Sequence, residues 1–292
     1  MSRPLPDNFP AASVGNRRTA VLVNRKTAAL RMEEPMNEGE RRFWWGRTAL
    51  VVVVYLTSWG LLQWLGRALE GWAEALSLAL FMMLYVAASG ILLPLNVGSK
   101  AGLRLREPSR GWRPWVGALL LIVALGAGLL GSGVLTELLA TPPGWTVILK
   151  YMLLFLPMSL AVALVSFWLV PLTVLKRFGS GLGGTLTAVA AGGVVSFLGF
   201  WVDGLFGDPA TALIMGFLGL LLTAAVVFLR SIWLVYPVFA LLMLTNTLVE
   251  GKYHGVSWWA LGVGFAVALA ALIVGLRGGR KGLEARRVEP TG

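Results

Sequence analysis

The sequence predicts an all-α membrane protein, a bundle of about eight transmembrane helices with both termini in the cytoplasm. Three observations lead to this prediction. Of the 292 residues, 57% are hydrophobic and only 13% are charged, whereas a soluble domain carries about 25% charged residues. The hydrophobic residues are grouped into stretches long enough to cross a bilayer. Lys and Arg are concentrated in alternate loops between these stretches.

Eight stretches meet the requirement of about 20 apolar residues for one crossing of the hydrocarbon core. The fourth is longer than one crossing needs and contains Pro157 and Pro171. We therefore expect this helix either to tilt and kink or to extend beyond the hydrocarbon core. The eight stretches are residues 48–66, 72–95, 115–135, 147–175, 185–202, 210–229, 232–249 and 257–275.

The loops on one side of this arrangement carry most of the basic residues, while the other side has Arg67, Lys150 and Lys252. Because Lys and Arg are retained in cytoplasmic loops, the basic side is predicted to be cytoplasmic. An even number of spans then places both termini there. The basic residues on this side are Arg41, Arg42, Arg47, Lys100, Arg104, Arg106, Arg110, Arg113, Lys176, Arg177, Arg230, Arg277, Arg280, Lys281, Arg286 and Arg287.

The net charge of +11 is typical of loops that face anionic lipid, so the expected partners are the bilayer and another membrane protein, with no nucleic acid. We expect a multi-pass protein of the cell (plasma) membrane. Residues 41–276 form the predicted transmembrane helical domain, and residues 277–292 form a basic cytoplasmic tail.

Residues 1–40 are expected to be a basic, disordered segment, since they contain no apolar span and no signal-peptide core. The peptide 32–36 (MEEPM) can be encoded by a purine-rich ribosome-binding sequence followed by a start codon. Met36 is therefore a second candidate for the initiator methionine.

The residue inventory excludes several kinds of chemistry. The chain has no cysteine and one histidine, His254, so disulfides, thiolate sites and clustered-histidine metal sites are excluded. No Asp or Glu occurs in residues 139–202. A proton relay or ion-coupled transporter normally has a carboxylate within its spans, and the sequence disfavours that mechanism. No cofactor is predicted.

Four uncharged polar residues within the predicted spans are candidates for a site. Asn246 is the most notable, because its amide can hydrogen-bond to a neighbouring helix within the seventh span. Tyr236, Ser166 and Thr173 are the others. In a transporter, these side chains would line a water-filled cavity near the middle of the membrane.

Acidic residues and the imidazole also share the predicted outer face. Asp203, Asp208, Glu250 and His254 are weak candidates for a metal site there. A structural role accounts for the same residues, since Asp208 followed by proline is typical of a helix N-cap. Glu250 and His254 fall in a short solvated turn. We therefore predict no catalytic residues and no metal site, and these four residues are kept as the weak candidates for a metal site.

Several segments between residues 103 and 249 share features with one known family. Segment 103–108 (LRLREP) is basic and precedes a span, segment 171–179 (PLTVLKRFG) follows an apolar run, and Asn246 ends a third passage. Span six contains Gly216 and Gly219 and is followed by Arg-Ser-Ile-Trp. Together these segments resemble the CPBP family of intramembrane proteins, the prokaryotic relatives of CAAX-processing proteases.

The resemblance implies three motifs: a Glu-Glu pair followed by Arg, Phe-x-x-x-His, and His-x-x-x-Asn. In active members these motifs are thought to hold a metal and activate water. Neither the acids nor the imidazoles are present here, because Trp201 and Leu242 stand in place of the two histidines. The positions that correspond to the motifs are Val162, Ala163 and Phe167, then residues 197–201, then Leu242 and Asn246.

We therefore expect a catalytically inactive CPBP-like protein that acts as a membrane-embedded binding, regulatory or complex subunit. Two alternatives stay open: a transporter or permease subunit, and an active CPBP-type protease with an unrecognised site. A binding scaffold predicts a filled bundle, a transporter predicts a water-filled cavity, and an enzyme predicts a bound metal.

Overall fold

The computed structural model describes residues 38–68, 73–107, 111–131, 134–204, 209–250 and 257–288. Within these residues the chain is helical apart from turns, short loops and one isolated antiparallel bridge between Arg106 and Ser231. Six described helices are long and apolar enough to cross a membrane, so the chain is a polytopic helical membrane protein. They are Leu76–Lys100, Arg113–Leu130, Trp145–Phe178, Leu182–Val202, Ala212–Leu229 and Trp258–Gly278.

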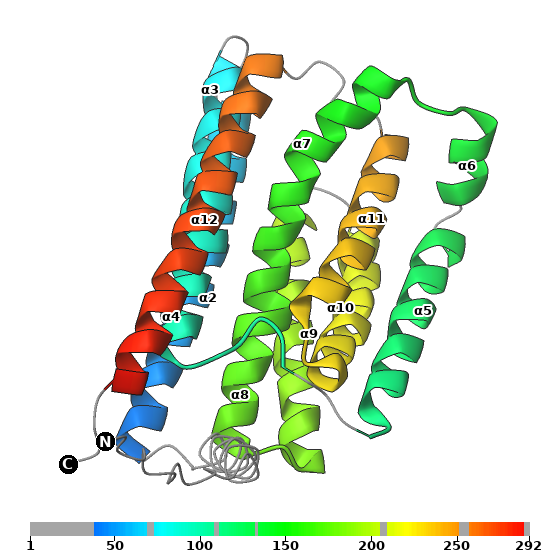
Figure 1. The fold of residues 1–292 in the computed structure, drawn as a ribbon. Helices are drawn as coiled ribbons and strands as arrows, with labels where there is room; N and C mark the ends of the chain where they lie inside the picture. The colour runs from blue at the N-terminus through cyan, green and yellow to red at the C-terminus, as the bar shows by residue number, and fades with distance from the viewer. Residues whose placement is uncertain are drawn as a thin grey trace, which may run out of the picture. The chain divides into compact units, whose positions relative to one another are not determined.

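The helices run alternately up and down the bundle (Figure 1). Two of them are composite, since α3, η2 and α4 follow without a break, as do α7, η3 and α8. In chain order the elements are α2 (Glu38–Ala68), α3 (Ala73–Leu80), η2 (Phe81–Leu92), α4 (Leu93–Lys100), α5 (Arg113–Gly131), α6 (Val134–Ala140), α7 (Trp145–Val162), η3 (Ala163–Leu169), α8 (Val170–Phe178), α9 (Leu182–Gly204), α10 (Pro209–Leu229), α11 (Ile232–Glu250) and α12 (Trp258–Val288).

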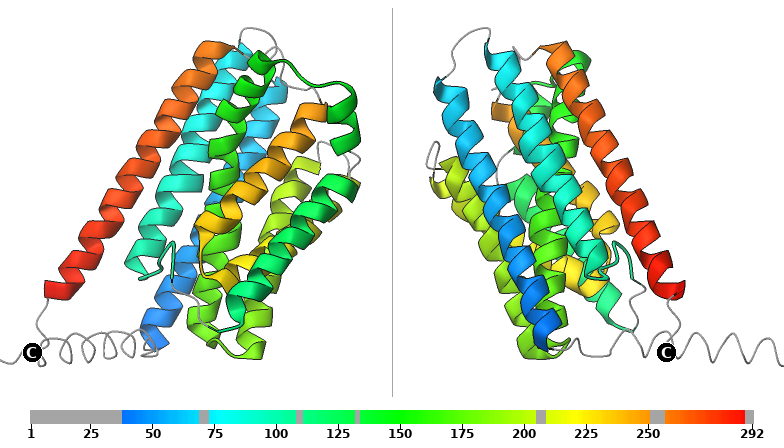
Figure 2. Two further views of the ribbon diagram at one scale, coloured as in Figure 1. Left: turned by 45° about the vertical axis from the view of Figure 1, so that its right-hand side comes forward. Right: turned by 90° about the vertical axis from the view of Figure 1, so that its left-hand side faces the viewer.

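Each predicted span coincides with one of these helices, although the helices and the predicted spans differ in extent. The six that meet the length and hydropathy requirement do not include α2, and the apolar part of α11, Ile232–Thr245, is shorter than a full crossing. The last helix continues to Val288, into the predicted tail, and lies alongside η2 and α4 (Figure 2). The predicted 1–40 segment falls almost entirely outside the described residues.

The composite helix α7–η3–α8 forms the centre of the bundle. In its spanning window 83% of the residues are buried, against 11% in the window of α5. Phe167 and Trp168 are among its fully buried side chains. A helix that is apolar all round is suited to this place, because every face meets another helix. The extra length of the fourth predicted span therefore belongs to a helix enclosed by protein.

Two segments of π-helix interrupt the composite helices, and each ends two residues before a proline. Segment η2 ends at Leu92, before Pro94, and η3 ends at Leu169, before Pro171. Proline lacks the backbone N–H and its ring presses on the preceding turn, so a wider turn relieves the clash. The pattern Ser-x-x-Leu-x-Pro-Leu-x-Val occurs in both places, at 89–97 and 166–174. The same local sequence thus produces the same local geometry twice.

The loop after α4 is tied to the central helix by side chains that bond its backbone. The indole Nε1 of Trp168 donates a hydrogen bond to the carbonyl oxygen of Arg104 at 3.0 Å. The ammonium group of Lys176 donates to the carbonyl oxygen of Ala101 at 2.6 Å. Buried carbonyl groups need such donors, and the loop is therefore held against the end of the bundle.

The same loop is paired with the junction between α10 and α11. The N–H of Glu107 donates to the carbonyl oxygen of Arg230 at 2.7 Å, and the N–H of Ile232 donates to the carbonyl oxygen of Leu105 at 3.1 Å. Arg230 has a φ of +53°, a conformation uncommon for a residue with a side chain. Its guanidinium lies 3.8 Å from the Glu107 carboxylate. Burial lowers the pKa of Arg230, and the Glu107 charge opposes that change.

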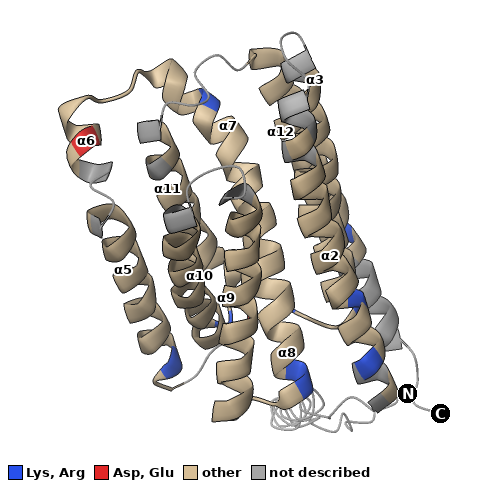
Figure 3. Ribbon diagram, turned by 180° about the vertical axis from the view of Figure 1, so that it is seen from behind, with Lys and Arg blue, Asp and Glu red and all other residues tan. Residues whose placement is uncertain are grey.

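Basic residues gather at one end of the bundle (Figure 3). Lys100, Arg113 and Arg177 lie at or near helix ends on this side, and Arg277 lies near the end of the apolar part of α12, Trp258–Gly278. At the opposite end Lys150 lies near the start of α7, and Glu137 lies on the short helix α6. The alternating direction of the helices brings together charges that are far apart in the sequence.

We predict that Gly90→Ala destabilises the protein by about 1–3 kcal/mol, as expected for overpacking of a closed interface. A Cβ at Gly90 would overlap the Cβ of Ala161 and lie 3.2 Å from its Cα, so a fixed helix backbone would have to move. The matched control is Gly126→Ala, because a Cβ there meets nothing within 4 Å. Thermal unfolding of the detergent-purified chain measures both, and equal melting temperatures would show that the two helices are not closely packed.

Candidate functional site

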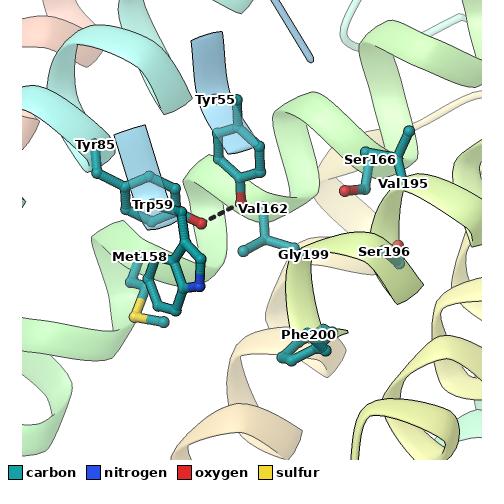
Figure 4. A pocket seen from close by; sticks show the side chains of 10 residues that line it. All are labelled: Tyr55, Trp59, Tyr85, Met158, Val162, Ser166, Val195, Ser196, Gly199 and Phe200. Atoms are coloured by element: carbon teal, nitrogen blue, oxygen red, sulfur yellow. Dashed lines mark hydrogen bonds between the residues drawn. The ribbon is translucent and has the colours of Figure 1, made fainter. Parts of the chain in front are cut away.

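A cavity inside the bundle lies where five helical segments meet (Figure 4). The volume open to the centre of a water molecule is about 20 Å³, enough for one or two waters. The lining contains no acidic, basic or imidazole group. The lining residues are Tyr55 and Trp59 from α2, Tyr85 from η2, Met158 and Val162 from α7, Ser166 from η3, and Val195, Ser196, Gly199 and Phe200 from α9.

One wall of the cavity is a cluster of aromatic rings. Tyr55 and Tyr85 stack with centroids 4.8 Å apart, and the ring of Trp59 lies 4.5 Å from that of Tyr85. The Tyr85 hydroxyl donates a hydrogen bond to the Tyr55 hydroxyl. Aromatic pairs at these separations are favourable beyond the area they bury, so α2 and η2 hold this wall in a defined geometry.

Two serine hydroxyls, Ser58 on α2 and Ser89 on η2, also contact each other across these two segments. The Ser89 hydroxyl donates to the carbonyl oxygen of Tyr85 at 2.7 Å and lies 3.1 Å from the Ser58 hydroxyl. Ser58 in turn donates to the carbonyl oxygen of Tyr55 at 2.9 Å. In an apolar environment such bonds remove the penalty of a buried hydroxyl, and they fix the side of η2 that faces α2.

The indole N–H of Trp59 is the unsatisfied polar group of the site. Trp59 is 6% exposed, and its Nε1 has no hydrogen-bond partner among the described residues. Figure 4 shows this nitrogen on the side of the ring that faces Gly199. A buried donor without an acceptor is destabilising by about 1–3 kcal/mol. The geometry is therefore suited to a guest that accepts a hydrogen bond.

Two buried serines lie on the side of the cavity opposite Trp59, so polar groups are present on two of its walls. Ser166 and Ser196 are each 1% exposed. The Ser196 hydroxyl donates to the carbonyl oxygen of Gly192 at 3.0 Å, which leaves its oxygen able to accept. A water in the cavity can accept a hydrogen bond from the Trp59 indole, and the serine oxygens are further acceptors on the same lining.

The four polar residues singled out in the sequence have different places in the structure. Ser166 lies on the cavity wall. The Thr173 hydroxyl donates to the carbonyl oxygen of Leu169 at 2.7 Å and lies 3.3 Å from the Thr48 hydroxyl. The Tyr236 hydroxyl donates to the carbonyl oxygen of Leu156 at 3.0 Å. Asn246 lies on α11, and its side chain is outside the described part of the chain. Of the three candidates whose side chains the structure describes, Ser166 alone lines the cavity.

The weak metal candidates fall mostly outside the described residues. Asp203 and Glu250 lie near the ends of α9 and α11, with side chains that are not described, and Asp208 and His254 are not described at all. In the described ranges, no group of three or more His, Cys, Asp or Glu side chains is placed to hold a metal. The outer-face site stays a prediction from the sequence.

Sequence reasoning missed the aromatic wall of the cavity. Trp is enriched at the membrane interfaces, yet Trp59 lies in the middle of the predicted first span, away from either interface. Tyr55 precedes it by one helical turn, which puts both side chains on the same face. A Trp in the middle of a span, one turn from a Tyr, could have indicated this aromatic wall. The repeated proline pattern that contains Ser89 and Ser166 was a second feature that could have been used.

We predict that Trp59 and Ser166 are energetically coupled through the cavity that both line, although no direct bond joins them. In a double-mutant cycle of Trp59→Phe and Ser166→Ala, unfolding free energies should be non-additive by about 0.5–1.5 kcal/mol, because each change alters the hydration of the same small cavity. The control pairs Trp59→Phe with Thr187→Ala, an exposed hydroxyl bonded within its own helix. Additivity in both cycles would rule out the coupling. Chemical denaturation in detergent measures each free energy.

No protein-family model matches the chain, and neither a curated protein nor a solved structure matches it. The conclusion that this is a polytopic helical membrane protein therefore rests on its own sequence and structure, on the six spanning helices above all.

Proposed function

We propose that the protein is a non-catalytic, CPBP-like membrane protein that works as a binding or regulatory subunit of a membrane complex. Its cavity would be the counterpart of an active site, retained for packing or for a small neutral guest. The proposal rests on where the motif-like segments lie and on what their side chains are.

The observation that carries the proposal is the convergence of two motif-like segments on the cavity. Val162 stands at the first motif position of the resemblance, and Gly199 and Phe200 belong to segment 197–201, the second. All three line the same cavity. Where an active relative would present carboxylate and imidazole groups, these three residues are apolar. Such residues cannot ligate a metal or activate water.

Three further motif positions are packed into the core, whereas Trp201 is 42% exposed. Ala163 and Phe167 are fully buried, and Leu242 is 4% exposed. Phe167 contacts Phe239 edge to face with centroids 5.0 Å apart. A metal ligand at any of these positions would need a charged or polar group in a close-packed apolar environment, which is unfavourable without partners. The residues present instead stabilise the bundle.

The alternative of a transporter receives less support from the described residues. A passage for substrate needs a cavity much larger than the water-sized one described above, lined by polar groups that are free to bind. Two of the four polar candidates, Thr173 and Tyr236, are instead bonded to backbone carbonyl groups of the bundle. They act as contacts between and within helices.

We further propose that the basic end of the bundle faces the cytoplasm, with both termini on that side of the plasma membrane. Support comes from Lys100, Arg113, Arg177 and Arg277 at this end, because basic residues are retained on the cytoplasmic side. The eight-span arrangement belongs to this proposal, with α2 and α11 crossing alongside the six longer apolar helices.

We predict that the detergent-purified protein binds no stoichiometric metal. The lining of the cavity offers no ligand for one, so inductively coupled plasma mass spectrometry should give the same background for wild type and His254→Ala. Near-stoichiometric zinc in the wild type that disappears in His254→Ala would overturn the non-catalytic proposal and locate the site in the outer loops.

Single cysteines test the orientation, because the natural chain has none. Ser180 and Thr141 are exposed positions at opposite ends of the bundle. In intact cells a membrane-impermeant maleimide should label Thr141→Cys and should label Ser180→Cys only after permeabilisation. The reverse pattern would place the basic end outside, and labelling of both in intact cells would contradict the placement of these positions on opposite sides of the membrane.

A further inference from the structure

A patch of basic and aromatic side chains lies at the basic end, where α2 begins and α8 ends. The basic–aromatic patch consists of Phe43, Trp44, Trp45 and Arg47 from α2, and Arg177 and Phe178 from α8. The two helices are held together one turn away, where the hydroxyls of Thr48 and Thr173 lie 3.3 Å apart. The patch is therefore built on a fixed junction between two helices.

Both guanidinium groups of the patch rest on aromatic rings. The Cζ of Arg47 lies 4.1 Å from the ring centroid of Phe43 and 5.3 Å from that of Trp44. The Cζ of Arg177 lies 5.2 Å from the ring centroid of Trp45, which belongs to the other helix, and 5.4 Å from that of Phe178. These distances are typical of cation–π contacts, which restrict the two arginine side chains to a few conformations.

Stacking on a ring uses the face of a guanidinium and leaves its edges for other partners. The N–H groups of arginine project in the plane of the group, in a fork that matches two oxygens of a phosphate. Holding the fork in place beforehand reduces the entropy lost on binding. Arg47 and Arg177 thus present pre-organised donors for an anion with several oxygens.

The aromatic rings indicate where that anion comes from. Phe43 is 51% exposed and Phe178 is 55% exposed. Large apolar rings beside charged groups are poorly placed in water and well placed at the headgroup level of a bilayer. Phe178 is also the last residue of a membrane-spanning helix, Trp145–Phe178. A lipid supplies both the phosphate for the arginines and the acyl chain for the rings.

We propose that the basic–aromatic patch is a binding site for the phosphate headgroup of an anionic phospholipid. Arg47 and Arg177 bind the phosphate oxygens, and Phe43 and Phe178 contact the upper part of the acyl chains. The negative charge of the cytoplasmic leaflet supplies such lipids at the face where the basic end is proposed to lie.

The test is titration of the detergent-purified full chain with dioctanoyl phosphatidylglycerol, followed by native mass spectrometry. The double variant Arg47→Gln/Arg177→Gln should bind on the order of 20-fold more weakly, since each arginine near a headgroup contributes about fivefold. The matched control is Arg277→Gln, an exposed arginine at the same end on α12, which should stay within about twofold of wild type. Phosphatidylcholine should bind the wild type more weakly than phosphatidylglycerol.

A second variant separates recognition from folding and from charge alone. Arg47→Lys/Arg177→Lys keeps both charges but loses the planar fork, and should bind with intermediate affinity. Wild-type affinity in the Gln variant, or an equal loss in Arg277→Gln, would overturn the proposal. If glycerol phosphate at the same concentration displaced the lipid, the phosphate bound at this site would come from a soluble compound, and the proposal of a lipid ligand would be wrong.

Discussion

The structure depends on one constraint, that each backbone polar group in hydrocarbon must be hydrogen-bonded within the protein. Helices meet it everywhere except where proline removes a donor. At Pro94 and Pro171 the preceding turns widen into η2 and η3. These widened segments carry Tyr85 and Ser166, which line the cavity. The repeated proline pattern thus accompanies both widened segments, whereas Pro157 and Pro237 lie within ordinary α-helix. π-helical turns are often found at functional sites.

The same constraint applies to polar side chains, and most of them are bonded within their own helix. Thr173, Ser196 and Thr223 each donate to the carbonyl oxygen four residues earlier. Such local bonds allow a hydroxyl to be buried without specifying a ligand. Trp59 differs, because an indole N–H has no carbonyl of its own turn to bond, and it faces a cavity instead. An unsatisfied donor among satisfied hydroxyls is what distinguishes the cavity from ordinary packing defects in a helix bundle.

The sequence was sufficient for the helical class and for six of the eight predicted spans, because apolar length is a local property. It could not reveal which helix lies at the centre. Lipid and protein interiors favour the same apolar side chains. The sequences of α5 and of the buried α7–η3–α8 helix are therefore similarly apolar, although only the second is enclosed by protein. It also could not find the cavity, since its walls combine α2, η2, α7, η3 and α9. The resemblance to a known family, and the chemistry that it implies, stay predictions.

The basic–aromatic patch and the cavity share two helices, α2 and the composite α7–η3–α8. On α2, Arg47 and Trp59 are separated by about 18 Å at 1.5 Å per residue. On the central helix, Ser166 in η3 and Arg177 in α8 have a similar separation. Between the two sites, Thr48 and Thr173 hold α2 against α8. A helix pair that shifts at one site must therefore change the contacts at the other, because close-packed helices do not deform continuously. This shared pair is therefore the direct physical link between the basic–aromatic patch at the end of the bundle and the cavity in its interior.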